Sequence, residues 1–337
     1  MNGLSVVIPE PGDLRLVPTE AQAPGPGEAL VKVAHSGICG SDRDVYTGTR
    51  PSGFVRYPVT PGHEWSGTVE AVGDDVDPAL VGKPVVGEGF RNCQVCPACR
   101  RGDANLCAAD YDETGFTRPG AWSSFLTLPA RLLHVLPDGA DLRAAAVLEP
   151  AACAAAACLK LAVSPGERVA VIGGGSLGLL SAQLLAASSP AELTLVHSRP
   201  GREELAAACG ATSYVTSPQA EELTGRFDAV IEAAGASGCA DLATRLVRRG
   251  GRVALTGIPE RDEQPLSSAH LVLSEVTVHT VFGASPRAWN HAVRAFAAGV
   301  LQPEKLISRQ FSITEAAEAL RVLSTERDDV VKILLGP

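Results

Sequence analysis

The chain has 337 residues, of which 45% are hydrophobic and 20% are charged, values typical of globular proteins and far from the disordered range. The length exceeds what one compact core usually holds, so we expect two domains. A net charge of −9 argues against nucleic acid and anionic membranes as partners.

No segment of the sequence suits a membrane span or a secretory leader. The longest apolar stretch, residues 144–163, is interrupted by Glu149, Pro150 and Lys160. The N-terminus does not resemble a leader peptide. We therefore expect a cytoplasmic protein that binds no membrane.

The first 140 residues are rich in Val, Gly and Pro, and short apolar runs alternate with turn signals. Closely spaced runs of this kind are typical of a β-rich domain of barrel type. The runs are 29–34, 67–72, 84–87 and 121–128.

Two short motifs in this part of the chain carry metal-ligand residue types. Cys39 is followed closely by Ser41 and Asp42, and His63 stands directly before Glu64. Taken alone, each would be structural, because a buried Cys behaves as a small hydrophobic residue and a lone His is usually a satisfied core residue. Thiolate, imidazole and carboxylate together are ligands that suit zinc.

Four cysteines, Cys93, Cys96, Cys99 and Cys107, follow within fifteen residues. Disulfides are disfavoured in a chain of this length without a leader. An iron–sulfur cluster fits less well, because the last gap is seven residues and Ala108, not proline, follows. A redox Cys-x-x-Cys pair would leave two thiols over. The spacing favours a closed, structural zinc site.

From about residue 143 the pattern changes, because an apolar helical stretch (144–163) is followed by alternating strands and helices. The expected strands are 168–172, 192–197, 227–232 and 252–257, with helices starting at Leu177, Arg202 and Cys239. This alternation is typical of a doubly wound parallel sheet. After about residue 280 the pattern ends, and we expect helices over 288–298 and 313–323 and a last strand over 330–335.

The strand 168–172 runs directly into a G-x-G-x-x-G sequence and a helix, which indicates dinucleotide binding. Gly173 permits the tight turn, Gly175 lets the backbone approach a pyrophosphate, and Gly178 lets the helix pack on the strand. The phosphates are expected on the helix N-terminus, at Ser176 and Leu177.

The end of the next strand distinguishes the two nicotinamide dinucleotides. An acidic residue there would bind the ribose 2′-hydroxyl of NAD, but the sequence has none before Glu203. Hydroxyl and guanidinium groups in this position suit the 2′-phosphate of NADP. We therefore favour NADP(H) over NAD(H), bound by a set that also includes His197, Ser198, Arg199 and Arg202.

Taken together, these motifs resemble a zinc-dependent medium-chain alcohol/polyol dehydrogenase over essentially the whole chain. The resemblance implies an α/β protein with a β-rich GroES-like catalytic domain and a doubly wound parallel-sheet Rossmann domain. The corresponding boundaries are 1–145 for the catalytic domain (structural zinc lobe 88–112), 146–280 for the Rossmann domain, and 281–337 for a return to the catalytic domain. Dimers or tetramers are also implied, and the apolar stretch 271–282 is either a sheet edge shared across a dimer or the last internal strand.

The resemblance also assigns roles to residues. It implies that Cys39, His63 and Glu64 bind a catalytic zinc and that the four cysteines bind the structural one. Ser41 would take the substrate proton, and Asp42 would orient His63. Lys332 stands where the family has a basic residue near the cofactor phosphates.

Two positions depart from the family pattern. Glu149, before Pro150, matches the zinc-facing Glu of sorbitol dehydrogenases, while Cys153 falls where simple alcohol dehydrogenases have a thiolate, so both stay candidates. Asp44 replaces the histidine that often completes the proton relay.

The implied function is hydride transfer between a secondary alcohol or ketone and a nicotinamide cofactor. The turn 115–120, Trp65 and the Glu149–Pro150 pair resemble sugar and aminocyclitol dehydrogenases, and Arg118, Asp110, Asp112 and Glu113 could face such a substrate or be a solvated loop. Two alternatives stay open: an NADPH-dependent reductase of a simple ketone or aldehyde, and a non-catalytic nucleotide-binding protein.

Overall fold

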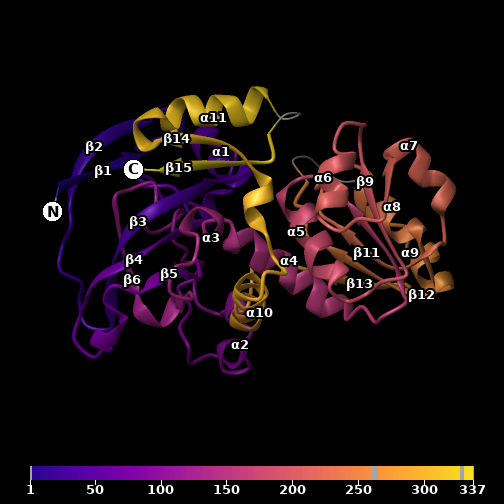
Figure 1. The fold of residues 1–337 in the computed structure, drawn as a ribbon, viewed down its shortest axis with the longest axis horizontal. Coiled ribbons are helices and arrows are strands. Elements are labelled where there is room, and N and C mark those ends of the chain that lie inside the picture. The colour runs from indigo at the N-terminus through magenta and orange to yellow at the C-terminus, as the bar shows by residue number, and fades with distance from the viewer. Residues whose placement is uncertain (1, 260–264, 327–329, 337) are drawn as a thin grey trace. The chain divides into compact units, whose positions relative to one another are not determined.

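The computed structural model describes every residue except 1, 260–264, 327–329 and 337. Backbone contacts divide the chain into two units, in which unit 1 contains Met1–Glu149 and Leu306–Pro337 and unit 2 contains Pro150–Lys305. In Figure 1 the yellow C-terminal strand β15 (Lys332–Gly336) accordingly lies with the indigo N-terminal half of the chain. The sequence-based domain boundaries at 145 and 280 stay a prediction.

Unit 1 is built on a seven-stranded sheet with the order β14-β15-β3-β4-β5-β7, to which β6 adds by pairing with β3. The pairs are antiparallel apart from β14 and β15, which are parallel. A separate antiparallel ribbon joins β1 and β2. The remaining bounds are β1 Asn2–Val7, β2 Arg15–Glu20, β3 Glu28–Ile38, β4 Trp65–Val72, β5 Pro84–Gly87, β6 Phe125–Pro129, β7 Leu133–Val135 and β14 Ile307–Ser312.

Short helices accompany the unit 1 sheet: α1 (Gly40–Thr47), α2 (Pro97–Arg100), α3 (Leu142–Ala145) and α11 (Ala316–Thr325). Helix α11 packs beside β14 and β15, as Figure 1 shows, and its buried Ala319, Leu320 and Val322 join a hydrophobic cluster with the last strand. Trp65 is 2% exposed and packs in a second cluster against β3, β5 and β6. Trp65 is therefore a core residue.

Unit 2 contains a six-stranded, wholly parallel sheet with the order β10-β9-β8-β11-β12-β13. This is the strand order of a doubly wound dinucleotide-binding fold, so the predicted fold class is confirmed. The strands are β8 Arg168–Ile172, β9 Glu192–His197, β10 Ser213–Thr216, β11 Phe227–Glu232, β12 Val247–Leu255 and β13 Thr277–Thr280. The helices are α4 Leu148–Leu161, α5 Ser176–Ala186, α6 Glu203–Ala208, α7 Ser217–Ala220, α8 Cys239–Leu246, α9 Ser268–Ser274 and α10 Pro286–Ala297.

Several elements differ from the sequence-based prediction, among them the strand considered over 271–282, whose first residues belong to helix α9. The single helix expected over 144–163 is divided into α3 and α4, with a break at Ala146–Val147. Pro150 explains the break, because its ring would clash with the carbonyl of residue 146 in a continuous helix but is tolerated in the first turn of α4. The edge strand β10 was missed, since its four residues are all half-buried and show no alternation. Among the described residues, none of the helices combines the length and apolar character needed to cross a bilayer.

Candidate active site and cofactor site

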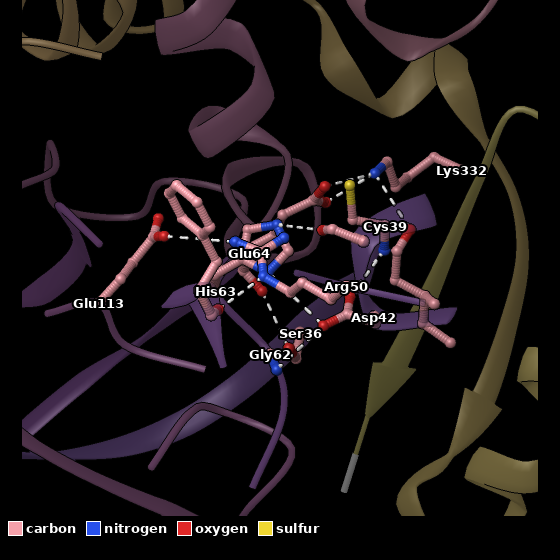
Figure 2. A network of polar contacts seen from close by, with 12 residues as sticks. Ser36, Cys39, Asp42, Arg50, Gly62, His63, Glu64, Glu113 and Lys332 are labelled. Atoms are coloured by element: carbon pink, nitrogen blue, oxygen red, sulfur yellow. Dashed lines mark hydrogen bonds and ion pairs between the residues drawn. The ribbon is translucent and has the colours of Figure 1, made fainter. Parts of the chain in front are cut away.

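Cys39, His63 and Glu64 come together at one end of the β3–β4 pair in unit 1 (Figure 2). Cys39 follows β3 and caps α1, while His63 and Glu64 immediately precede β4. The antiparallel register places Ser36 opposite Trp65, and this brings the two motifs together. One ligand atom from each residue lies within 4.8 Å of the others. A thiolate, an imidazole and a carboxylate at this spacing fit a zinc ion.

Asp42 lies beside the imidazole of His63. Its Oδ1 lies 3.5 Å from His63 Nδ1, and its Oδ2 accepts a hydrogen bond of 2.9 Å from the Cys39 amide. Burial opposes a charge on His63, but the Asp42 carboxylate and the Cys39 thiol raise its pKa well above the ordinary value. The field that favours an imidazolium here would equally favour a metal cation bound to a neutral imidazole.

Glu64 is paired with a buried lysine from the other end of the chain. Lys332 Nζ donates to Glu64 Oε1 at 2.8 Å, to Oε2 at 2.7 Å and to the Ile38 carbonyl at 3.2 Å. The two side chains are 4% and 1% exposed. Sequence reasoning missed this pair and connected Lys332 with the cofactor phosphates, because nothing local in the sequence joins residues 268 positions apart.

The other residues predicted for this site differ in their contacts and in their distance from the cluster. Ser41 Oγ lies 3.5 Å from His63 Nε2, the ring nitrogen turned away from Asp42. Asp44 accepts hydrogen bonds of 3.2 and 3.0 Å from the adjacent Arg43 guanidinium. Glu149 is half-buried and its charge raises the pKa of Lys332. Cys153 belongs to unit 2, and the described cluster of possible ligands includes neither Glu149 nor Cys153.

Several polar and aromatic side chains lie beside His63. The sequence analysis did not connect them with one another. The Phe116 ring lies 4.7 Å from the His63 ring between centroids, and the Arg50 guanidinium stacks 3.6 Å above Phe116. Arg50 also donates to the hydroxyl of Tyr111, which in turn donates to Glu113; Figure 2 shows Arg50 and Glu113 beside His63. The turn 115–120 was noted in the sequence, but nothing in it pointed to Arg50.

The four cysteines of the 88–112 lobe form a second cluster, separate from the first. One Sγ atom from each lies within 4.8 Å of the others. Backbone amides donate to the sulfurs: Cys93 to Cys107 Sγ at 3.3 Å, Cys96 to Cys93 Sγ at 3.4 Å, and Cys99 and Ala108 to Cys96 Sγ at 3.5 Å. The Ala108 and Cys99 amides lower the pKa of Cys96 to about 6. Amide donors stabilise thiolates, so this donor set fits zinc.

The glycine-rich loop in unit 2 has the geometry of a dinucleotide cradle. Gly173 has φ 120°, and a Cβ at Gly178 would lie 1.8 Å from the Gly173 carbonyl oxygen, so both positions require glycine. A Cβ at Gly175 would meet nothing within 4 Å. Gly175 caps α5, which begins at Ser176 and Leu177, and the N-terminus of a helix favours anions. The open space at Gly175 therefore suits a pyrophosphate.

Residues after β9 contact the same loop. The Gly174 amide donates to His197 Nδ1 at 3.3 Å, and Arg202 donates from its guanidinium to the Gly174 carbonyl. Ser198 and Arg199 are exposed, and the Arg199 carbonyl accepts from the Tyr214 hydroxyl. The structure thus brings His197 and Arg202 to the cradle and leaves the side chains of Ser198 and Arg199 at the surface nearby.

Comparisons with known proteins agree with both sites. The sequence model of the alcohol dehydrogenase GroES-like domain matches residues 25–138, and that of the zinc-binding dehydrogenase matches 176–298. The chain is similar to L-galactonate-5-dehydrogenase of Escherichia coli (30% identity; 94% of each chain) and to sorbitol dehydrogenase of Bacillus subtilis (28% identity; 92% of this chain and 90% of that one). Among solved structures, a protein of Sinorhizobium meliloti described as a zinc-binding dehydrogenase and bound to NADP matches with a TM-score of 0.91, 29% identity and 100% coverage of both chains.

Proposed function

Because this chain belongs to the zinc-dependent medium-chain alcohol/polyol dehydrogenases, which transfer a hydride between an alcohol or its ketone and a nicotinamide cofactor, we propose that its substrate is a secondary alcohol of a polyol, sugar or aminocyclitol. The observation that carries this proposal is the Cys39–His63–Glu64 cluster with charged side chains around it. Relatives named for sorbitol and L-galactonate support the polyhydroxylated class.

Cys39, His63 and Glu64 are proposed to hold the catalytic zinc. When bound, zinc would supply a Lewis acid that lowers the pKa of the substrate hydroxyl. Asp42 keeps the imidazole in the orientation and tautomer that leave Nε2 free. Ser41 Oγ, 3.5 Å from His63 Nε2, is proposed to relay the hydroxyl proton as the substrate is oxidised: it accepts that proton and releases its own toward solvent.

We propose Glu149 as the further zinc-facing residue in preference to Cys153. The support is electrostatic: Glu149 lies close enough to influence the pKa values of both Glu113 and Lys332, which border the cluster. Glu149→Gln is expected to lower the zinc content and turnover, while Cys153→Ser retains both. Metal analysis by mass spectrometry decides between them, and the reverse result would assign the role to Cys153.

The cysteine cluster is proposed as a structural zinc site. With all four positions filled by thiolates, no coordination position stays open for a substrate. All nine cysteines of the chain are free thiols, which supports the further proposal of a reducing, cytoplasmic location.

We propose NADP(H) as the preferred cofactor, bound at Gly173, Gly175 and Gly178 and by the residues after β9. Arg202 is the principal support, because its guanidinium already lies against the glycine-rich loop. Combined Arg199→Ala and Arg202→Ala substitutions are expected to weaken NADPH binding far more than NADH binding, as measured by titration of nicotinamide fluorescence. Equal weakening would mean that these arginines do not recognise a 2′-phosphate.

A homodimer, alone or within a tetramer, is proposed through the edge of the unit 2 sheet. Strand β13 pairs with β12 on one side and ends the sheet on the other. Val272 and Leu273, on helix α9 that precedes β13 in the chain, are 74% and 73% exposed and are neighbouring apolar side chains that a partner could cover. A monomer by light scattering at micromolar concentration would contradict this proposal.

The experiment that tests the function is a turnover panel on zinc-loaded enzyme. NAD⁺ and NADP⁺ are each paired with polyols, cyclitols, aminocyclitols and simple aliphatic alcohols. Turnover of a cyclic or linear polyol with NADP⁺ is expected. Turnover of simple alcohols alone would contradict the substrate class, and turnover of nothing would contradict the enzymatic proposal.

A further inference from the structure

The acidic residues of the 110–113 segment lie in three different environments. Asp110 is exposed. Asp112 is paired with Arg118, whose Nε and Nη2 donate to its oxygens at 2.8 and 3.0 Å. Glu113 is only 6% exposed. Asp110 is therefore a surface residue, Asp112 is a half-buried one held by Arg118, and Glu113 is the most buried of the three.

The turn that carries Glu113 is fixed against the backbone of the metal-ligand motif. Gly115 has φ 85°, and a Cβ there would lie 2.9 Å from the Gly62 carbonyl carbon and 3.0 Å from the His63 nitrogen. The Phe116 amide donates to the Glu113 carbonyl at 3.3 Å, and the Phe116 ring stacks on His63. Glu113 is thus held in a defined position beside the cluster (Figure 2).

The contacts of Glu113 leave one of its carboxylate oxygens without a donor. Oε2 accepts from the Tyr111 hydroxyl and lies 3.9 Å from Arg50 Nη2. Arg50 is itself occupied, since its Nε donates to the Phe54 carbonyl at 2.8 Å. Among the residues that the structure describes, none donates a hydrogen bond to Oε1. Oε1 therefore keeps the capacity to accept a hydrogen bond from a ligand.

The charges around Glu113 favour a donor rather than an acceptor as that ligand. Burial raises the pKa of Glu113 to about 8, and the carboxylates of Glu149 and Asp42 add to the increase, while His63 and Arg50 oppose it. The ammonium of Lys332 is already neutralised by Glu64. The Glu149 and Asp42 carboxylates favour a ligand group that donates a hydrogen bond or carries positive charge, and binding such a group would lower the pKa of Glu113 and ionise it.

We propose that Glu113 selects the substrate by binding, through Oε1, a second hydroxyl or an ammonium group that the substrate carries near the carbinol to be oxidised. This inference rests on the proposed function and narrows it to alcohols with such a neighbouring donor. Glu113 is a specificity residue, and the hydride and proton transfers do not pass through it.

The test compares cyclohexanol with cyclohexane-1,2-diol and 2-aminocyclohexanol, each as all stereoisomers, in wild type, Glu113→Gln and Glu113→Leu. The readout is the ratio of kcat/KM for each donor-bearing substrate to that for cyclohexanol. Glu113→Leu is expected to lower this ratio about 10- to 100-fold, mainly through KM, since the contact exists before and during hydride transfer. Glu113→Gln keeps a hydrogen-bond acceptor but removes the negative charge. It should therefore leave the ratio for the diol unchanged, and it should lower the ratio for the amino alcohol if the bound group is an ammonium.

Asp112→Asn is the matched control, because it neutralises a more exposed acid of the same loop whose carboxylate is paired with Arg118, and its ratios should equal those of wild type. Equal losses on all three substrates in both Glu113 variants would overturn the inference and leave the residue a purely structural support. A wild-type enzyme that does not prefer the donor-bearing substrates over cyclohexanol would overturn it as well. Turnover of none of the three by the wild type would refute the proposed function and the inference with it.

Discussion

Replacing Lys332 with methionine is expected to destabilise unit 1 severely, because it leaves Glu64 as an uncompensated buried charge. Lys332 and Glu64 are 4% and 1% exposed, and the ammonium makes hydrogen bonds of 2.7 and 2.8 Å to the carboxylate. Removing one partner of a buried ion pair costs about 3–5 kcal/mol. For a unit of this size, such a loss lowers the unfolding temperature by roughly 6–20 °C.

The double variant Glu64→Gln/Lys332→Met tests whether the loss comes from the unpaired charge of Glu64. It removes both charges, and replacing a complete buried pair is often close to neutral, so it should recover at least half of the lost stability. Lys83→Met is the matched control: Lys83 also pairs with an acid, Asp138 at 3.2 Å, but the two side chains are 42% and 83% exposed. An exposed pair is worth about 0–1 kcal/mol.

Differential scanning calorimetry of the four proteins at pH 7, each treated with chelator so that no metal compensates Glu64, measures the effect. Burial opposes the charge on Lys332, but Glu64, Cys39 and Glu149 raise its pKa, so the wild-type protein keeps the ammonium at this pH. A loss for Lys332→Met no larger than that for Lys83→Met would refute the reasoning. So would a double variant that is less stable than the single one.

Three further outcomes are expected. Gly178→Ala should destabilise unit 2, because its Cβ would lie 1.8 Å from the Gly173 carbonyl oxygen, whereas Gly175→Ala should preserve the melting temperature and weaken NADP(H) binding at least tenfold by fluorescence titration. Cys99→Ser should remove one of two zinc equivalents by mass spectrometry, and two retained equivalents would contradict the structural site. In chelator-treated protein, Glu113, with its pKa raised to about 8, should make stability fall as pH rises from about 4 to 8, by at most about 1.4 kcal/mol per pH unit. Urea titrations of Glu113→Gln should show a flatter dependence, and parallel curves would contradict this.

The parts of the molecule that the sequence predicted are those encoded locally. Four cysteines within one lobe and glycines at fixed spacing after a strand have few geometric solutions, and the alternation of strands and helices from Arg168 to Leu255 leaves few topologies. The Glu64–Lys332 pair could not be predicted in this way. It depends on β15 pairing with β3 across most of the chain length, a contact that no local pattern specifies.

The acidic segment shows a second limit of sequence reasoning. Asp110, Asp112 and Glu113 look alike as a solvated charge run. What separates them is burial, and burial depends on how closely the following turn approaches the Gly62–His63 backbone. Composition records the charges but not that approach: the segment is solvated at Asp110 and buried at Glu113, and contact with a substrate stays a prediction.

Gly115 is the residue on which that approach depends, and it allows a direct test of whether the loop and the metal cluster act together. Gly115→Ala places a Cβ 2.9 Å from the Gly62 carbonyl carbon and 3.0 Å from the His63 nitrogen, in addition to the cost of φ 85°. Gly139 has φ 80° with nothing within 4 Å of its Cβ, so Gly139→Ala carries only the backbone cost, about 1–2 kcal/mol.

The excess effect of Gly115→Ala over Gly139→Ala therefore measures displacement of the loop from the cluster. Because Phe116 stacks on His63 and Glu113 lies on the same turn, the displacement should lower both the affinity of the protein for zinc and the preference for donor-bearing alcohols. Competitive chelator titration and the substrate ratios measure the two quantities. If both variants lose the same stability and retain both properties, the loop does not position the cluster, and metal binding and substrate selection are independent in this enzyme.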